Sequence, residues 1–564
     1  MSAVKPLDAH YIQWHARRLV EAVRRFGLVH RDEDGGFLIF LFARHWLIRE
    51  VHPHYRLQVA RALDTPERDP PVSSWLLHQV EEGDDAAWIG MLWDRFAQNS
   101  QTDTTPARLM PPPVVQGIKE QRVGELIRRW RQLGLFMVPY QQEVRRLGAV
   151  EREVMRDLGG ADDRERIGLI DSLQVADQSI PSWAKMALIP RLACPESCRH
   201  CMFIWRPPMK HLPDPGPLLA TINQRTANLL FTGGDLTGEL DLFHHAIATM
   251  DQVETFAILL NGQLAHTRAA ADDFFAALHR ALARRPRSFA RARVVVQISL
   301  DEYHQEILAN RRGELRERIP VAHVARLLIA GAGWNGGTVA LVHKQNSLNF
   351  STLLFQHGVL GRLAAELELR GWNIGDVHWL TSPRSKEHPA QPGRQGGVIR
   401  EAQLSLVGPA TAATVHFISS CIDAMGRAEL MDRSEYVHEP LLLESWLQGA
   451  SPVMDPFDTD PMLWRNGNVT LFGAIHLWMG HFFEEGDRIF TRWHKDPLVA
   501  ALARMDLRVL TAHQAWNARK HHELVQSATS PHGLMHAMTR DSAARLFLTR
   551  WLLTHPAERV LIPS

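Results

Sequence analysis

The chain has 564 residues, of which 45% are hydrophobic, and its 63 basic and 62 acidic side chains give a net charge of +1. This composition indicates a globular protein with a sizeable core, and the length predicts roughly three or four domain-sized units. Basic clusters at 128–131, 284–287 and 311–312 are offset by nearby acids or lie on expected helix faces, so we expect no nucleic-acid binding. Only four cysteines and no secretory signal exclude a disulfide framework.

Residues 1–180 are expected to form a mostly helical N-terminal domain. Apolar residues recur at helical spacing over 12–26 and 118–133, with a proline-rich boundary loop at 106–113 between them. The most apolar run, at 37–48, contains polar residues and is far shorter than the roughly 20 residues that cross a membrane. We therefore expect a buried helix there, no membrane segment, and a cytoplasmic protein.

The core domain is expected at 181–390, and its first strand, at 186–190, leads into three closely spaced cysteines. Cys194, Cys198 and Cys201 have the spacing C-x-x-x-C-x-x-C. Three thiolates on one loop can hold three irons of a 4Fe–4S cluster and leave the fourth iron without a protein ligand. The main alternative is a zinc site, which would need a fourth ligand from His200, Cys421 or another of the 30 histidines.

Further apolar runs of strand length follow and alternate with helical segments such as 269–284. These runs lie at 227–235, 254–260, 294–301, 338–343 and 376–381. Their alternation with helices, about six times over, predicts a parallel sheet with right-handed crossovers. In barrels of this kind the active site lies at the carboxyl ends of the strands. Residues suited to ligand binding stand at these ends, namely Gly233, Gly234, Asp235, Asn261, Ser299 and Asp301.

This set of motifs resembles the radical SAM superfamily. The resemblance rests on the cysteine spacing, on the aromatic Phe203 two positions after the last cysteine, and on the glycine turn one strand–helix unit later. It implies an α/β core built as a partial TIM-like (β/α)6 barrel. It also implies one 4Fe–4S cluster on the three cysteines, with S-adenosyl-L-methionine on the open iron. An external donor of the flavodoxin or ferredoxin type would supply the electron that cleaves this cofactor to a 5′-deoxyadenosyl radical.

The same resemblance implies which residues contact S-adenosyl-L-methionine. The family's usual turn is Gly-Gly-Glu, which binds the methionyl ammonium, and here the acid is one methylene shorter. The expected contacts are Phe203, Gly233, Gly234, Asp235, Asn261, Ser299 and Asp301.

Residues 391–564 are expected to form an α+β extension that covers the substrate. The stretch 463–486 resembles a SPASM domain, in which cysteines hold auxiliary iron–sulfur clusters. Those cysteines are missing here, and Phe472 or a neighbour stands where a ligand would be, so we expect no auxiliary cluster. Cys421 is a candidate hydrogen-atom donor to a substrate radical, with a buried inert thiol as the alternative. Tyr303 is a second candidate for that role.

These observations predict an enzyme whose radical abstracts hydrogen from an organic substrate. The SPASM-like stretch favours a peptide, such as the precursor of a ribosomal natural product. The missing auxiliary clusters and the lack of a leader-binding module favour a small metabolite of natural-product biosynthesis instead. A non-catalytic zinc- or cluster-binding protein is the alternative from a different class.

Overall fold

The computed structural model describes residues 12, 15–16, 19, 47, 51, 55–64, 159–174, 180–196, 198–203, 212–309, 315–345, 358–380, 384–388, 391–398, 401–422, 424–431, 436, 438–452 and 454–556. The strands are β1 Met186–Ile189, β2 Asn228–Phe231, β3 Thr255–Leu260, β4 Arg293–Ser299, β5 Ile307–Ala309, β6 Leu315–Glu317, β7 Gly337–Gln345, β8 Asn373–Trp379, β9 Arg384–His388, β10 Gln391–Val398, β11 Glu401–Val407, β12 Ala412–Cys421, β13 Pro461–Trp464, β14 Asn468–Leu471 and β15 Trp478–His481.

The α-helices are α3 Arg56–Ala60, α8 Ala161–Ser172, α9 Gly216–Arg225, α10 Leu240–Thr249, α11 Arg268–Arg284, α12 Val321–Gly331, α13 Gly358–Glu368, α14 Pro440–Leu447, α15 Phe482–Glu485, α16 Arg488–Lys495, α17 Pro497–Ala503, α18 Arg508–Trp516, α19 Ala518–Ser527, α20 Pro531–Thr539 and α21 Ser542–Thr554. Short 3₁₀ helices occur at η2 Arg61–Leu63, η4 Leu236–Glu239, η5 Gln263–Ala265 and η7 Gly426–Leu430.

The described strands form one sheet of 11 strands and two ribbons of two strands each. The order across the large sheet is β15-β14-β13-β1-β2-β3-β4-β7-β12-β11-β8. Neighbouring strands from β13 to β12 all run parallel, and the pairs at both edges are antiparallel. The predicted mixed α/β class with a parallel-rich sheet is therefore confirmed.

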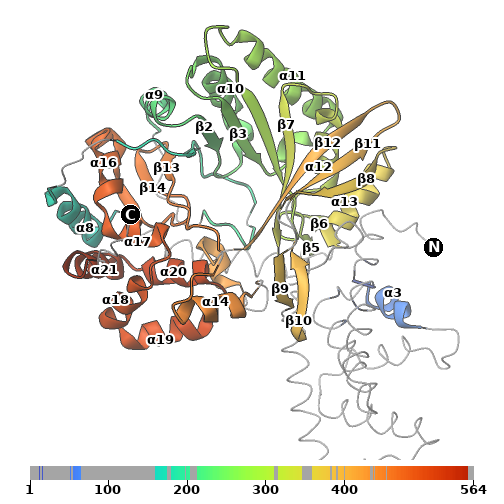
Figure 1. Ribbon diagram of the computed structural model, residues 1–564. Helices are drawn as coiled ribbons and strands as arrows, with labels where there is room; N and C mark the ends of the chain where they lie inside the picture. Colours follow the sequence, from blue (N-terminus) through green and yellow to red (C-terminus); the bar gives the residue numbers. More distant parts are fainter. Residues whose placement is uncertain are drawn as a thin grey trace, which may run out of the picture.

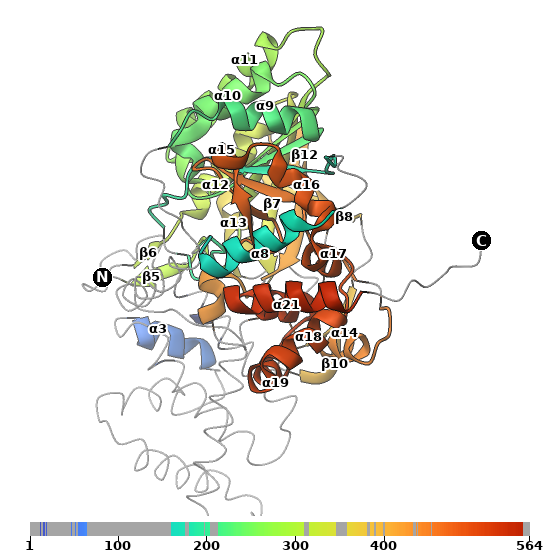
Figure 2. The same ribbon diagram turned by 90° about the vertical axis from the view of Figure 1, so that its left-hand side faces the viewer.

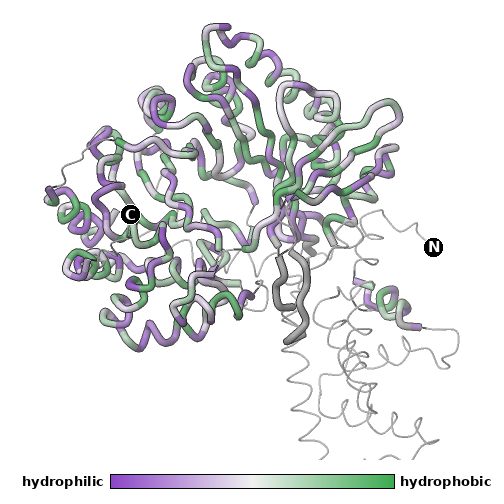
Figure 3. The backbone as a smooth tube through the Cα atoms, in the orientation of Figure 1, coloured by the Kyte–Doolittle hydropathy of each residue, from purple (hydrophilic) through white to green (hydrophobic). Residues whose placement is uncertain are grey.

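The strands of the parallel run form where apolar residues are consecutive or alternate. All four residues of β1 are buried, as expected for a strand covered on both faces, and β3 alternates buried and half-buried residues. Figure 1 shows α9, α10 and α11 along the outside of this part of the sheet, and Figure 3 shows green, hydrophobic chain concentrated along its strands. The strands expected at 186–190, 227–235, 254–260, 294–301 and 338–343 correspond to β1, β2, β3, β4 and β7.

The later strands do not continue the simple alternation of helices with parallel strands. The segment expected at 376–381 is a strand, β8, but it lies at the sheet edge and pairs antiparallel with β11. The place beside β7 is taken by β12, which is joined to β11 by a tight connection. At the other side, β13 from the C-terminal region pairs with β1. The strands β11 to β15 therefore belong to the same sheet as the strands of the expected core.

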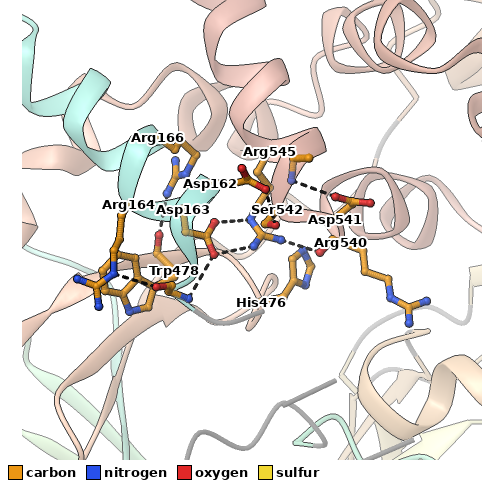
Figure 4. Close-up of polar contacts among 12 residues, drawn as sticks. Asp162, Asp163, Arg164, Arg166, His476, Trp478, Arg540, Asp541, Ser542 and Arg545 are labelled. Atoms are coloured by element: carbon orange, nitrogen blue, oxygen red, sulfur yellow. Dashed lines mark hydrogen bonds and ion pairs between the residues drawn. The ribbon is translucent and has the colours of Figure 1, made fainter. Parts of the chain in front are cut away.

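Helix α8 lies within the expected N-terminal domain but packs against the C-terminal helices. Figures 1 and 2 both show it beside α21. Asp163 accepts two hydrogen bonds from Arg545, at 2.9 and 2.8 Å, and both side chains are fully buried (Figure 4). Arg166 pairs with the buried Asp496 and donates to the carbonyl of Trp478. Paired buried charges of opposite sign fix this helix to its neighbours.

Most of the N-terminal predictions lie outside the described residues. These are the helical stripe at 118–133, the loop at 106–113 and almost all of the runs at 12–26 and 37–48. Leu19 and Leu47, from the first stripe and from the apolar run, are helical and buried. Among the described helices, none combines the length and the apolar character needed to cross a bilayer.

Replacing Arg545 by Ala should lower the free energy of unfolding by about 3–5 kcal/mol, because Asp163 would remain as a buried carboxylate without its partner. Arg550→Ala is the matched control, since Arg550 lies on the same helix and pairs with Glu165 of α8 at a site where the two side chains are 52% and 53% exposed. That loss should stay below about 1 kcal/mol. Denaturant titration would measure both, and equal losses would contradict the assigned role of the buried pair.

Candidate functional site

A cavity lies at the carboxyl ends of the parallel strands. Its lining comes from the loops after β1, β2, β3 and β4, from the end of β7, and from the chain after β12. The space between its walls, counted out into the open mouth, is about 1030 Å³. Most of the residues predicted from the sequence line it, namely Cys194, Cys198, Cys201, Phe203, Gly233, Gly234, Asn261, Ser299 and Asp301.

The three cysteines share one loop and none is in a disulfide. The amide of Cys201 donates to the carbonyl of Cys198 at 3.3 Å, which closes a turn between them. Burial raises the pKa of the Cys194 thiol to about 11 and that of Cys198 well above its usual value, and the neighbouring thiols raise both further. Ionising Cys194 and Cys198 is therefore costly, and a bound metal would compensate the charge of their thiolates.

The glycine turn after β2 is in direct contact with the chain that leads into the cysteines. The amide of Gly234 donates to the carbonyl of Arg191, and that of Asp235 to the carbonyl of Ala193, both at 2.9 Å. A Cβ atom would lie 2.4 Å from the carbonyl oxygen of Arg191 at Gly233 and 2.5 Å from that of Ala193 at Gly234. Gly233 also has a φ of +142°. The two glycines therefore allow the backbones of two strand ends to touch.

Asp235 lies beside this turn, but its side chain caps a helix. Its carboxylate accepts hydrogen bonds from the amide and the hydroxyl of Thr237, at 3.2 and 2.8 Å, and so caps the 3₁₀ helix η4. It does not belong to the residues that line the cavity. Among the predicted cofactor contacts, Asp235 is thus the one that does not line the cavity.

The end of β3 is tied to the cysteine loop through side chains. The amide of Asn261 lies 4.0 Å from the sulfur of Cys194, and its oxygen accepts from the backbone of Gln263. Gln263 in turn donates to the buried Glu196 at 2.8 Å. Glu196 lies between two of the cysteines in the sequence and lines the cavity. These contacts hold the loop against the sheet from the side of β3.

Asp301, after β4, is the centre of a buried polar group. One carboxylate oxygen accepts from the amides of Tyr303 and His304, at 3.0 and 2.8 Å. The other lies 2.7 Å from Nδ1 of His304 and 3.3 Å from Nε2 of His200. Although burial opposes its ionisation, the two imidazoles hold the pKa of Asp301 well below its usual range. Burial lowers the pKa of His200, and the neighbouring Asp301 carboxylate opposes this shift.

Residues of the C-terminal region contact the cysteine loop. The amide of Arg427, in η7, donates to the carbonyl of Cys201 at 2.9 Å. A Cβ at Gly426 would come within 2.5 Å of the carbonyl oxygen of Met202. Phe472 packs in one apolar cluster with Cys201 and Phe203. The SPASM-like stretch therefore lies against the cysteine loop, although none of its residues is among those that line the cavity.

The two candidates for handling a substrate radical lie just outside the cavity lining. Cys421, the last residue of β12, is partly exposed, and its carbonyl accepts from Nζ of Lys344 at 3.3 Å. Tyr303 is buried in a small apolar cluster with Tyr436. Neither belongs to the lining residues, whereas Ile422, next to Cys421, does.

Four polar lining residues had no place in the predicted site, namely Glu196, His200, His304 and Lys344. Of these, the cysteine spacing suggests only His200, as the fourth ligand of a zinc site. Glu196, His200 and His304 lie within three residues of predicted site residues, and Lys344 directly follows the strand expected at 338–343. This proximity is the one signal in the sequence that could have found them. Comparison with known proteins adds no assignment: no family model matches the chain, and neither does any curated protein.

Replacing Gly234 by Ala should displace the cysteine loop, because the new methyl group would collide with backbone atoms of Leu192 and Ala193. We expect little or no metal bound to the purified variant. Gly168→Ala is the control, since this helical glycine has open space around it, and alanine there should stabilise by about 0.5–1 kcal/mol. Metal analysis of both proteins is the measurement. Undiminished metal in Gly234→Ala would show that the close approach is dispensable.

Glu429 provides a prediction about pH. It lies in η7 and contacts Arg540 at 2.6 Å, yet burial raises its pKa from 4.5 to about 7. Because the folded state holds this proton more tightly, the contribution to stability is present below pH 4.5 and is lost as pH rises through about 7.

The difference in unfolding free energy between the wild type and Glu429→Gln should therefore fall with rising pH across this window, by up to about 3 kcal/mol. Glu165→Gln, at an exposed site, serves as control. Unfolding at several pH values tests this. A difference that stays constant between pH 4.5 and 7 would contradict the raised pKa of Glu429.

Proposed function

We propose that this protein is a radical SAM enzyme. Cys194, Cys198 and Cys201 would hold a 4Fe–4S cluster in the cavity at the strand ends, and S-adenosyl-L-methionine would bind the fourth iron. When bound, the two cofactors together supply a 5′-deoxyadenosyl radical that abstracts hydrogen from a substrate. We propose two details of the fold together with this function. The parallel run that includes β1, β2, β3, β4 and β7 would form a partial (β/α)6 barrel. The stretch 463–486 would be related to a SPASM domain.

The observation that carries the proposal is how the three sulfur atoms are spread. The three sulfur atoms do not all lie within 4.8 Å of one another. Among the described residues, one group of three potential ligand atoms is that compact, and it contains no cysteine. A single zinc ion, with Zn–S bonds of about 2.3 Å, requires its sulfur ligands to be about 3.8 Å apart. A cluster places each thiolate on a different iron, so its ligands need not converge on one point. The spacing of these thiols thus supports a cluster over zinc.

The protein groups around the cysteines fit such a cofactor in a second respect. Cys421 is outside the lining residues, so the cavity offers three thiols and leaves one iron free for a non-protein ligand. Ser299 and Asn261 present polar groups at two neighbouring strand ends, and Lys344 adds a cation at the end of β7. The remaining lining is largely apolar, which excludes water from the reacting atoms.

The substrate would be an organic molecule that reaches this cavity with an unactivated C–H group. A peptide side chain and a small metabolite of natural-product biosynthesis both meet this requirement. The electron would come from an external flavodoxin- or ferredoxin-type donor, in a cytoplasmic setting.

Anaerobically purified wild type should contain about four irons per chain and release 5′-deoxyadenosine when reduced with S-adenosyl-L-methionine present. Cys194→Ala, Cys198→Ala and Cys201→Ala should each lose both properties, because each removes one iron ligand. Cys421→Ala is the matched control and should retain both. Metal analysis and chromatography of the nucleoside are the measurements. Zinc in place of iron, with no cleavage of the cofactor, would refute the function and favour a zinc-binding protein.

A further inference from the structure

The polar group around Asp301 has the composition of a metal site separate from the cysteines. His200, Asp301 and His304 each offer one ligand atom, and these three atoms lie within 4.8 Å of one another. Oδ2 of Asp301 is 2.7 Å from Nδ1 of His304 and 3.3 Å from Nε2 of His200. Ligand atoms around one first-row metal ion, with bonds of about 2.0–2.2 Å, are separated by about 3 Å. Two of the three separations already match.

The carboxylate is held in position independently of the two imidazoles. Oδ1 of Asp301 accepts two backbone amides, so Oδ2 is directed to the space between the histidine rings. The rings meet edge to face with centroids 4.6 Å apart. Hydrogen bonds of this kind to the atoms behind a ligand are what orients a metal site before the ion arrives.

The donor atoms and the charges around them decide which ion could bind here. The three ligand atoms are two imidazole nitrogens and one carboxylate oxygen, which are donors that divalent transition-metal ions accept. Arg199 and Arg318, which are buried nearby, are both paired with Glu306. Lys344 donates to a backbone carbonyl. The two guanidiniums share one carboxylate, so they and Lys344 leave positive charge near the site, and the attraction for a divalent ion comes from its three ligands.

We propose that His200, Asp301 and His304 bind one divalent first-row transition-metal ion. Two imidazoles and one carboxylate form the donor set that suits iron(II) and related ions and leaves further coordination positions open. All three residues line the cavity that also contains the cysteines, and the His304 side chain is 20% exposed. The open positions would take an oxygen or nitrogen group of a substrate and hold it in that cavity.

A purely hydrogen-bonded role is the competing interpretation. In it, both histidines donate to Asp301 and only fix the loop after β4. The two interpretations differ in whether an added ion binds, and the answer does not depend on whether the cysteines carry a cluster.

Cobalt(II) is the probe, because it is distinct from cluster iron and its spectrum reports its ligands. The full-length protein should bind one equivalent with weak d–d absorption and without thiolate-to-cobalt charge-transfer bands. His304→Gln and Asp301→Asn should weaken this binding at least about tenfold. His279→Ala, at an exposed histidine of α11, should leave it unchanged.

Iron content and circular dichroism of every variant show whether the fold and the cysteine site persist. Cobalt binding of equal strength in the wild type and in folded variants would overturn the site. A wild-type spectrum dominated by thiolate bands would do the same, even if the variants fail to fold. A wild-type protein that contains no cluster iron but binds cobalt would count against the proposed function and would support this site.

Discussion

The contact between the Gly233–Gly234 turn and the chain at 191–193 is the constraint on which the site depends. It joins the ends of β1 and β2 through two backbone hydrogen bonds, and it leaves no room for a side chain on either glycine. The cysteines begin directly after this contact, so their loop leaves the sheet in a fixed direction. On its far side the loop is held by the amide of Arg427. The cavity wall is thus made by backbone contacts from three distant parts of the chain.

The elements of the parallel sheet could be predicted because their signals are local. Continuous or alternating apolar runs, such as the three valines of β4, identify strands wherever they stand in the sheet. Strand order is a different matter, because it depends on pairing between distant segments. No local pattern indicates that β12 takes the place beside β7, or that β13 extends the sheet next to β1. The packing of α8 on α21 is equally invisible, since its buried charges would be read as a solvated face.

The candidate site likewise contains residues that the sequence predicts and residues that it does not predict. The cysteines, the two glycines, Asn261 and Ser299 could be predicted because a motif or a strand end marks them. Asp235 has a capping role that follows from the Thr237 two residues later, which an inspection for ligand contacts overlooks. His200 and His304 carry no distinctive spacing, because one follows β1 and the other follows β4. Their meeting at Asp301 exists only once the two strands lie in one sheet.

The two proposed metal sites share one cavity, so metal ions would have to be sorted between them. The cysteine site offers soft sulfur atoms on a loop, and they do not converge on one point. The histidine–aspartate site offers nitrogen and oxygen atoms in a compact arrangement fixed by backbone amides. Ligand type and spacing select metals where raw affinity does not. A cluster that needs several separate thiolates cannot form at the compact site, and a single divalent ion cannot be bound by all of the spread thiols at once.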